Sequence, residues 1–149
     1  VQQACGRARC EVIRGGADAA FWLSSDAQLW QGDGAVIRLG WLPANIAPLM
    51  GWLPGLDAAE GARVTLLGRA GVGAGFMRID GPVAAQAGVI ARLRQSPAMV
   101  RHVVVLRASS ELKALVDVWG PSSPADGALR LIKRQFDPQG VLNAGRGSI

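Results

Sequence analysis

The order of strand-like and helix-like segments between residues 36 and 109 constrains the fold more than any other feature. Residues 36–41 alternate apolar and polar side chains, the period of a half-buried strand. The segments that follow are a helical pattern over 43–53, short strand-like runs over 62–70 and 75–80, a second helical pattern over 82–96, and a β-branched run over 101–109. This order predicts an α+β, ferredoxin-like (βαββαβ) fold, in which two helices cover one face of a four-stranded antiparallel sheet.

Prolines and glycines predict where these segments begin and end. Asn45 is expected to cap the first helix, which leaves Pro48 within its first turn, and Pro54 with the following glycine is expected to end it. Pro82 is expected to open the second helix. The glycine-rich "GRAGVGAG" at 68–75 lies between two strands and lacks the Lys-Ser/Thr of a phosphate loop, so it predicts a hairpin turn.

Three further helices are predicted outside this unit. The first covers residues 15–30, before the first strand. The second follows a Ser cap in "SSELKALVDVWG", where apolar residues at helical spacing run from Leu112 to Trp119. The third, "DGALRLIKRQF" at 126–136, places Leu129, Ile132 and Phe136 on one face and basic residues near its C-terminal end.

Length and composition are those of one globular domain, residues 1–149. The chain is 50% hydrophobic, begins with Val and opens without the apolar stretch of a signal peptide, so we expect a piece of a longer protein. The longest uncharged run, 39–56, has 18 residues but contains three prolines and three glycines. It is therefore expected to be a buried core segment and not a membrane span.

Charge and cysteines exclude some classes of site. The net charge is +5, with 14 Arg and 2 Lys spread along the chain, which permits an anionic partner without requiring one. Cys5 and Cys10 with a single histidine do not form a set of zinc ligands, so free thiols and no metal site are expected. His102 stands at the entry of the last strand, where its imidazole either marks the strand's start or faces a substrate.

The C-terminal tail, "RQFDPQGVLNAGRGSI" at 134–149, has the composition of a shaped loop. Pro138 disfavours helical geometry at Asp137, and Gly140 allows a turn with positive φ. Asn143 can donate and accept hydrogen bonds, and Arg146 offers a planar set of donors suited to carboxylate or phosphate. These residues leave two interpretations open: a ligand-facing loop, or a cap on the last helix.

The tail also carries a family resemblance. "LIKRQFDPQGVLNAGR" resembles the C-terminal signature of the FAD-linked oxidases of the vanillyl-alcohol-oxidase type. Upstream, "VIRLGWLPANIAPLM", "GRAGVGAGFMRIDG" and "VVVLRASSELKALVDVWGP" are similar to the C-terminal half of the glycolate oxidase FAD-binding subunit. The resemblance covers most of residues 36–147, and Ala144 stands where the family usually has Pro.

The resemblance implies a ferredoxin-like C-terminal domain, with an FAD-binding domain preceding residue 1. It places Asn143 and Arg146 against the FAD, assigns no catalytic residue, and implies that this chain alone is inactive. The implied reaction is oxidation of a 2-hydroxy acid such as glycolate to the 2-oxo acid. The implied partners are the chain's own flavin domain and other glycolate oxidase subunits, including an iron-sulfur subunit; the implied location is cytoplasmic, or on the inner membrane face through those subunits.

Two other functions compete with this one. A non-catalytic assembly domain of an oxidoreductase complex is compatible with the same residues, because five tryptophans could anchor interfaces. An RNA-binding RRM module shares the βαββαβ order, and Phe76 could occupy one of its stacking positions. Ala74 and Ile79 occupy other aromatic positions and the chain has no Tyr, so no nucleic-acid partner is expected.

Overall fold

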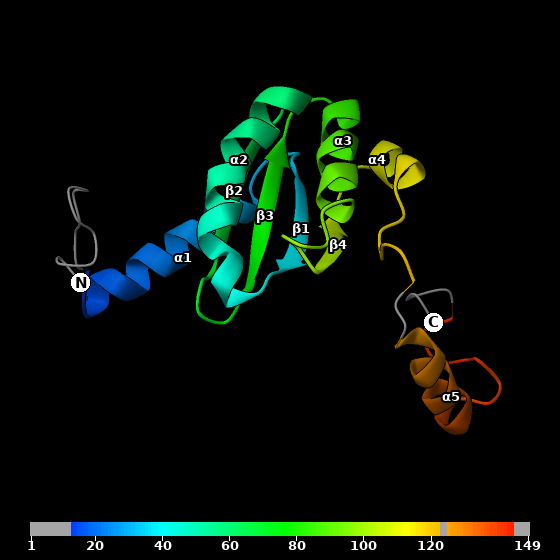
Figure 1. Cartoon of the computed structure of the whole chain (residues 1–149). Coiled ribbons are helices and arrows are strands. Elements are labelled where there is room, and N and C mark those ends of the chain that lie inside the picture. The colour runs from blue at the N-terminus through cyan, green and yellow to red at the C-terminus, as the bar shows by residue number, and fades with distance from the viewer. Residues whose placement is uncertain (1–12, 123–124, 145–149) are drawn as a thin grey trace.

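The computed structural model describes residues 13–122 and 125–144 (Figure 1). Its centre is a sheet of four strands, β1 (Ala35–Gly40), β2 (Arg63–Arg69), β3 (Ala74–Asp80) and β4 (His102–Arg107). The strand order is β2-β3-β1-β4, and every neighbouring pair is antiparallel. The helices are α1 (Gly16–Trp30), α2 (Ile46–Glu60), α3 (Val83–Arg94), α4 (Ser110–Leu115) and α5 (Asp126–Phe136), with a 3-10 turn, η1, at Pro43–Asn45.

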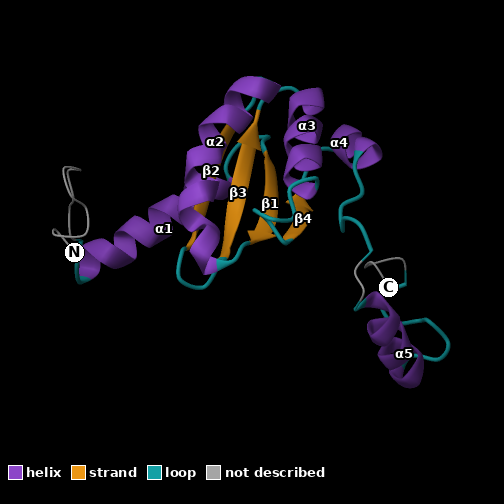
Figure 2. Cartoon of the chain, in the orientation of Figure 1, coloured by secondary structure: helices purple, strands orange, loops and turns teal. Residues whose placement is uncertain are grey.

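This arrangement confirms the predicted α+β, ferredoxin-like fold. The chain order β1-α2-β2-β3-α3-β4 is the βαββαβ order, and α2 and α3 lie side by side on one face of the sheet (Figure 2). Helices α1, α4 and α5 are the predicted additions before and after this unit.

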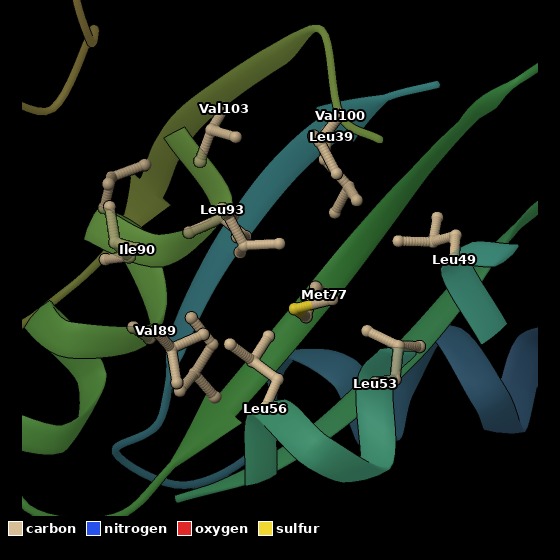
Figure 3. Close-up of a cluster of buried hydrophobic side chains, with 14 of the residues drawn as sticks. Leu39, Leu49, Leu53, Leu56, Met77, Val89, Ile90, Leu93, Val100 and Val103 are labelled. Atoms are coloured by element: carbon tan, nitrogen blue, oxygen red, sulfur yellow. The ribbon is translucent and has the colours of Figure 1, made fainter. Parts of the chain in front are cut away.

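The hydrophobic core lies between the sheet and helices α2 and α3. Every second residue of each strand points into it. The helices contribute Leu49, Leu53 and Leu56 from α2 and Val89, Ile90 and Leu93 from α3 (Figure 3). Its strand members are Ala35, Ile37, Leu39, Met77, Ile79, Val103 and Val105. The strands thus bury this face, as their alternating patterns predict, and Val36 of the opposite parity in β1 is buried as well.

Helix α2 differs from the prediction at both ends. It continues through Pro54 to Glu60, because Leu56, which follows the proline, is fully buried. Pro54 has no N–H to donate to the Met50 carbonyl, and Met50 is exposed to water. Asn45 does not cap the helix with its side-chain oxygen; its Nδ2 donates to the Ala98 carbonyl oxygen at 2.5 Å. Pro48 does fall in the first turn, as expected.

Helix α4 is shorter than predicted. The Ser109 hydroxyl accepts a hydrogen bond from the Leu112 N–H at 3.2 Å, so the Ser cap is confirmed, but Val116 is already extended. The Val105 N–H at the edge of β4 donates to the Val118 carbonyl at 2.7 Å. The helix therefore ends early because the chain pairs with an open strand edge.

The glycine-rich segment at 68–75 forms the predicted β2–β3 hairpin. A Cβ on Gly75 would lie 2.7 Å from the Leu67 carbonyl oxygen and 3.0 Å from the Trp41 ring. A Cβ on Gly68, its partner across the hairpin, would lie 2.7 Å from the same ring. These two glycines let the hairpin strands pass close to the buried Trp41 indole.

Some expectations concern residues outside the described ranges, and others concern a membrane span and a metal site. Cys5, Cys10 and Arg146 lie outside the described residues. Among the residues that are described, no helix is long and apolar enough to cross a membrane. The same residues contain no cluster of three His, Cys, Asp or Glu side chains that could hold a metal ion.

Candidate functional site: a groove on the open sheet face and a terminal turn

The sheet face opposite α2 and α3 carries a mixture of apolar and cationic side chains. Its central row runs across all four strands through Leu67, Phe76, Arg38 and Val104, which are paired in register. The row on one side of it contains Arg69, Ala74, Gly40 and His102. Because α2 and α3 cover only the other face, we call this the open face.

Helix α1 crosses part of the open face and is fixed there by arginines from the strands. It contacts β2 and β3, Leu29 is buried, and the Trp30 ring lies 6.2 Å from that of Phe76. Arg78 donates to the Gln28 carbonyl at 2.9 Å and to the Gln31 carbonyl, and Arg107 donates to the Trp30 carbonyl. These cations satisfy carbonyls at a helix C-terminus that has no basic residue in its own last turn.

Arg78 is itself held by Asp80. Its Nε donates to both carboxylate oxygens at 2.8 and 2.9 Å, and its Nη2 lies 2.7 Å from Oδ1. These hydrogen bonds, with the negative charges of Asp80 and Asp33, raise the pKa of Arg78. Arg78 is therefore a positioning residue for α1, with no donor set aside for a ligand.

The space between α1 and the sheet is a groove of about 480 Å³. We call it the open-face groove. Trp22, Leu23 and Asp26 of α1 form one wall, and the strands form the other; the strand residues lining it are Arg38, Leu67, Gly68, Arg69, Ala74, Gly75 and Phe76. The groove is large enough for a small organic ligand and its surface is mainly apolar.

The guanidinium of Arg38 is one of three charged groups that line this groove. Within the described residues its side chain makes no hydrogen bond or ion pair, although it stands on a central strand between Phe76 and Val104. Asp26 and Arg69 also line the groove without such a partner in the described part of the chain. A guanidinium among apolar side chains can bind a carboxylate through two parallel hydrogen bonds.

The terminal turn is held by the side chain of Asp137. Its two carboxylate oxygens accept from the Val141 N–H at 2.9 Å and the Leu142 N–H at 3.0 Å, and Asp137 itself is buried. Gly140 has φ of 66°, which confirms the positive-φ turn predicted there. Asn143 follows with φ of 51° and is exposed, so its amide is presented outward on a defined turn.

The structure does not bring the predicted site residues to the groove. Asn143 belongs to the segment after α5, which stands apart from the sheet in Figure 1. His102 lies on the open face at the start of β4 and is exposed, separated from Ala74 of the groove by strand β1.

The groove was not predicted from the sequence, because one of its walls is α1, and the position of α1 on the sheet depends on long-range contacts. Trp22, Leu23 and Asp26 lie in a segment of weak periodicity, and the Arg78 and Arg107 contacts that place it span 47 to 77 residues. Arg38 did carry a signal: it is the single charged residue within an otherwise apolar central strand.

In an RRM the open face holds RNA; here α1 crosses it and adds the carboxylate of Asp26 to its surface. Arg38 and Arg69 line the same groove, and the expectation that nucleic acid is not the partner stays a prediction.

No family model, curated protein or solved structure matches the chain.

Proposed function

We propose that this chain is the C-terminal domain of an FAD-linked oxidoreductase of the vanillyl-alcohol-oxidase type, most similar to the glycolate oxidase FAD-binding subunit. The substrate is a 2-hydroxy acid, which is oxidised to the 2-oxo acid. Support comes from the resemblance over residues 36–147 and from the ferredoxin-like sheet that this resemblance implies. In this proposal a flavin-binding domain precedes residue 1, and the open face is turned toward it.

The observation that carries the proposal is the unpartnered Arg38 in the open-face groove. It stands on a central strand between Phe76 and Val104, and its exposed guanidinium lines the mainly apolar groove, where a carboxylate can reach it. A hydrogen bond to a charged group contributes about 1.5–3 kcal/mol. Arg38 is thus suited to anchor the carboxylate of a hydroxy acid and to fix the orientation of its C2 carbon.

Other residues of the chain have supporting roles in this proposal. Asp26, across the groove on α1, can accept a hydrogen bond from the 2-hydroxyl group. The exposed amide of Asn143 has one donor group and one acceptor, which suits the FAD contact implied by the resemblance; Arg146 is its companion in that contact. FAD supplies the redox chemistry by accepting two electrons from the substrate, which pass to an iron-sulfur subunit or a quinone.

A non-catalytic assembly domain is the second candidate, and α5 favours it. Leu129, Ile132 and Phe136 form the predicted apolar face of this helix, and they are 43%, 55% and 80% exposed. An exposed apolar stripe of this kind is typical of a surface that binds another protein. This candidate and the first differ in whether the open-face groove contacts substrate.

The test is flavin reduction in the complete gene product, including whatever sequence precedes residue 1. Under anaerobic conditions a 2-hydroxy acid should bleach the flavin absorbance, and Arg38→Met should lower kcat/KM by about ten- to a hundredfold. Arg63→Met is the matched control, because Arg63 is exposed on the edge strand β2 and does not line the groove. Equal rates for Arg38→Met and wild type would favour the assembly domain.

A further inference from the structure

We infer that the open-face groove takes a 2-hydroxy acid with a bulky apolar side chain, an arylalkyl or branched alkyl group, in preference to glycolate. This inference rests on the proposed function and specifies its substrate class. It follows from the size of the groove, from the order of its residues across the sheet, and from the position of its charges.

The groove is much larger than a two-carbon acid. Its volume is about 480 Å³. Glycolate has no side chain beyond its hydroxymethyl carbon and occupies the space of only a few water molecules, each of which takes about 30 Å³. Glycolate bound at Arg38 would therefore leave most of the apolar wall in contact with water.

The register of the sheet aligns the apolar residues of this wall with Arg38. Arg38, Phe76 and Leu67 are direct neighbours on β1, β3 and β2, so they form a line across three strands. Adjacent strands are about 4.8 Å apart, which places Leu67 roughly 10 Å from Arg38. A carboxylate held by Arg38 therefore directs the rest of the acid along Phe76 toward Leu67.

Helix α1 covers this line with apolar side chains. Trp22 and Leu23 line the groove from the helix side, opposite the strand residues. Between the Trp22 indole and the Phe76 ring an aryl or branched alkyl group would have apolar contacts from two sides. A 2-hydroxy acid such as 3-phenyllactate has this arrangement of a carboxylate, a hydroxyl and an apolar end.

The other charged residues of the groove, Arg69 and Asp26, bear on whether it would accept a hydroxy dicarboxylate. Arg69 lines the far end on β2, two residues beyond Leu67, and could attract a second carboxylate. Asp26 lines the helix side and would repel one. Because Leu67, Phe76, Trp22 and Leu23 separate the two arginines, the middle of the groove is apolar and favours an uncharged side chain.

The experiment measures binding of a series of 2-hydroxy acids to the chain of residues 1–149 by NMR titration. The series is glycolate, 2-hydroxybutanoate, 2-hydroxyhexanoate and 3-phenyllactate, with 2-hydroxyglutarate as the dicarboxylate. Affinity should rise by up to about fourfold for each added CH₂ that is buried. Glycolate should bind weakest and 3-phenyllactate should bind at least tenfold more tightly than glycolate.

Four variants assign the effect to the groove: three change residues that line it, and one is a control on α5. Leu67→Ser should flatten the dependence on chain length, whereas Leu131→Ser, at an exposed position on α5, should leave it unchanged. Arg38→Met should weaken binding of every acid by a similar factor and keep the dependence on length. Trp22→Ala, on the exposed surface of α1, provides a second test of the apolar wall if Leu67→Ser does not fold.

Three results would overturn the inference: equal affinity along the series, tightest binding of 2-hydroxyglutarate, or no binding of any acid. If affinity is equal along the series but still depends on Arg38, the proposed function stands and only the substrate class is wrong. If flavin reduction in the complete protein is insensitive to Arg38, the proposed site itself is wrong.

Discussion

Arg38 and Arg78 occupy adjacent strands on the same sheet face, yet their surroundings give them opposite roles. Arg78 is satisfied by Asp80 and by carbonyls at the end of α1. Arg38 has apolar neighbours in register and no partner within the described residues. One guanidinium therefore stabilises the wall of the groove, and the other is available to a ligand.

Replacing Arg78 should release the C-terminal end of α1. Arg78→Met removes charge-assisted hydrogen bonds and leaves Asp80 without its cation, so we expect a loss of about 1.5–3 kcal/mol in the free energy of unfolding. Chemical denaturation measures this loss, and hydrogen exchange should show faster exchange in α1. Arg38→Met, which removes no internal contact, should leave stability within about 0.5 kcal/mol. Equal stability of the two variants would contradict the assigned roles.

Two glycines of the hairpin region should also differ in their tolerance of a side chain. Gly75→Ala should destabilise the fold by about 1–3 kcal/mol, because its Cβ would meet the Leu67 carbonyl, the Gly68 Cα and the Trp41 ring. Gly71→Ala is the control, since a Cβ at that position would have no atom within 4 Å. Thermal melts of both variants would decide this, and a Gly75→Ala protein as stable as Gly71→Ala would contradict the close approach.

At the scale of elements, the terminal turn is organised locally by one carboxylate. Asp137 accepts two backbone N–H groups, and its own N–H donates to the Lys133 carbonyl at 2.7 Å. Both interpretations of the tail thus share the same residues: the turn caps α5 and also presents Asn143 outward.

Asp137→Ala should disorder this turn without unfolding the domain. The Val141 and Leu142 amides lose their acceptors, so their hydrogen exchange should accelerate strongly, while the melting temperature of the sheet domain stays nearly constant. Asp137→Asn retains one oxygen acceptor and should have an intermediate effect. Unchanged exchange at both amides in Asp137→Ala would show that the turn is held in another way.

The sheet and its covering helices were predictable because their signals are local. The alternation around Arg38 in β1 and the β-branched run of β4 identify strand faces without knowledge of the tertiary structure. The ends of α2 and α4 were not predictable, because burial of Leu56 and the pairing of Val118 with β4 are tertiary effects that override local breakers and periodicity. The groove was missed for the same reason: it depends on contacts between distant parts of the chain.

At the scale of the whole molecule, the exposed surfaces suggest how this domain would fit a larger protein. The open-face groove lies on one side of the sheet. Helix α5 with its terminal turn stands apart from the sheet in Figure 1. In the proposed flavoprotein the groove contacts substrate, and the tail contacts the flavin domain through Asn143 and Arg146.

Arg146→Ala in the complete protein should therefore weaken FAD retention by about ten- to a hundredfold, the effect of losing one charged hydrogen bond. Flavin content after extensive dialysis measures this effect. The same substitution in residues 1–149 should barely change the melting temperature. Unchanged flavin content together with a destabilised domain would mean that the tail acts only as a helix cap.

The most direct test of the central claim is the anaerobic flavin spectrum of the complete gene product during titration with a 2-hydroxy acid. The proposal predicts a bound flavin that loses its visible absorbance on addition of the acid, with the 2-oxo acid formed in equal amount. It also predicts that Arg38→Met retains the flavin but requires a much higher concentration of the acid. A complete protein that binds no flavin, or a flavin that no 2-hydroxy acid reduces, would contradict it.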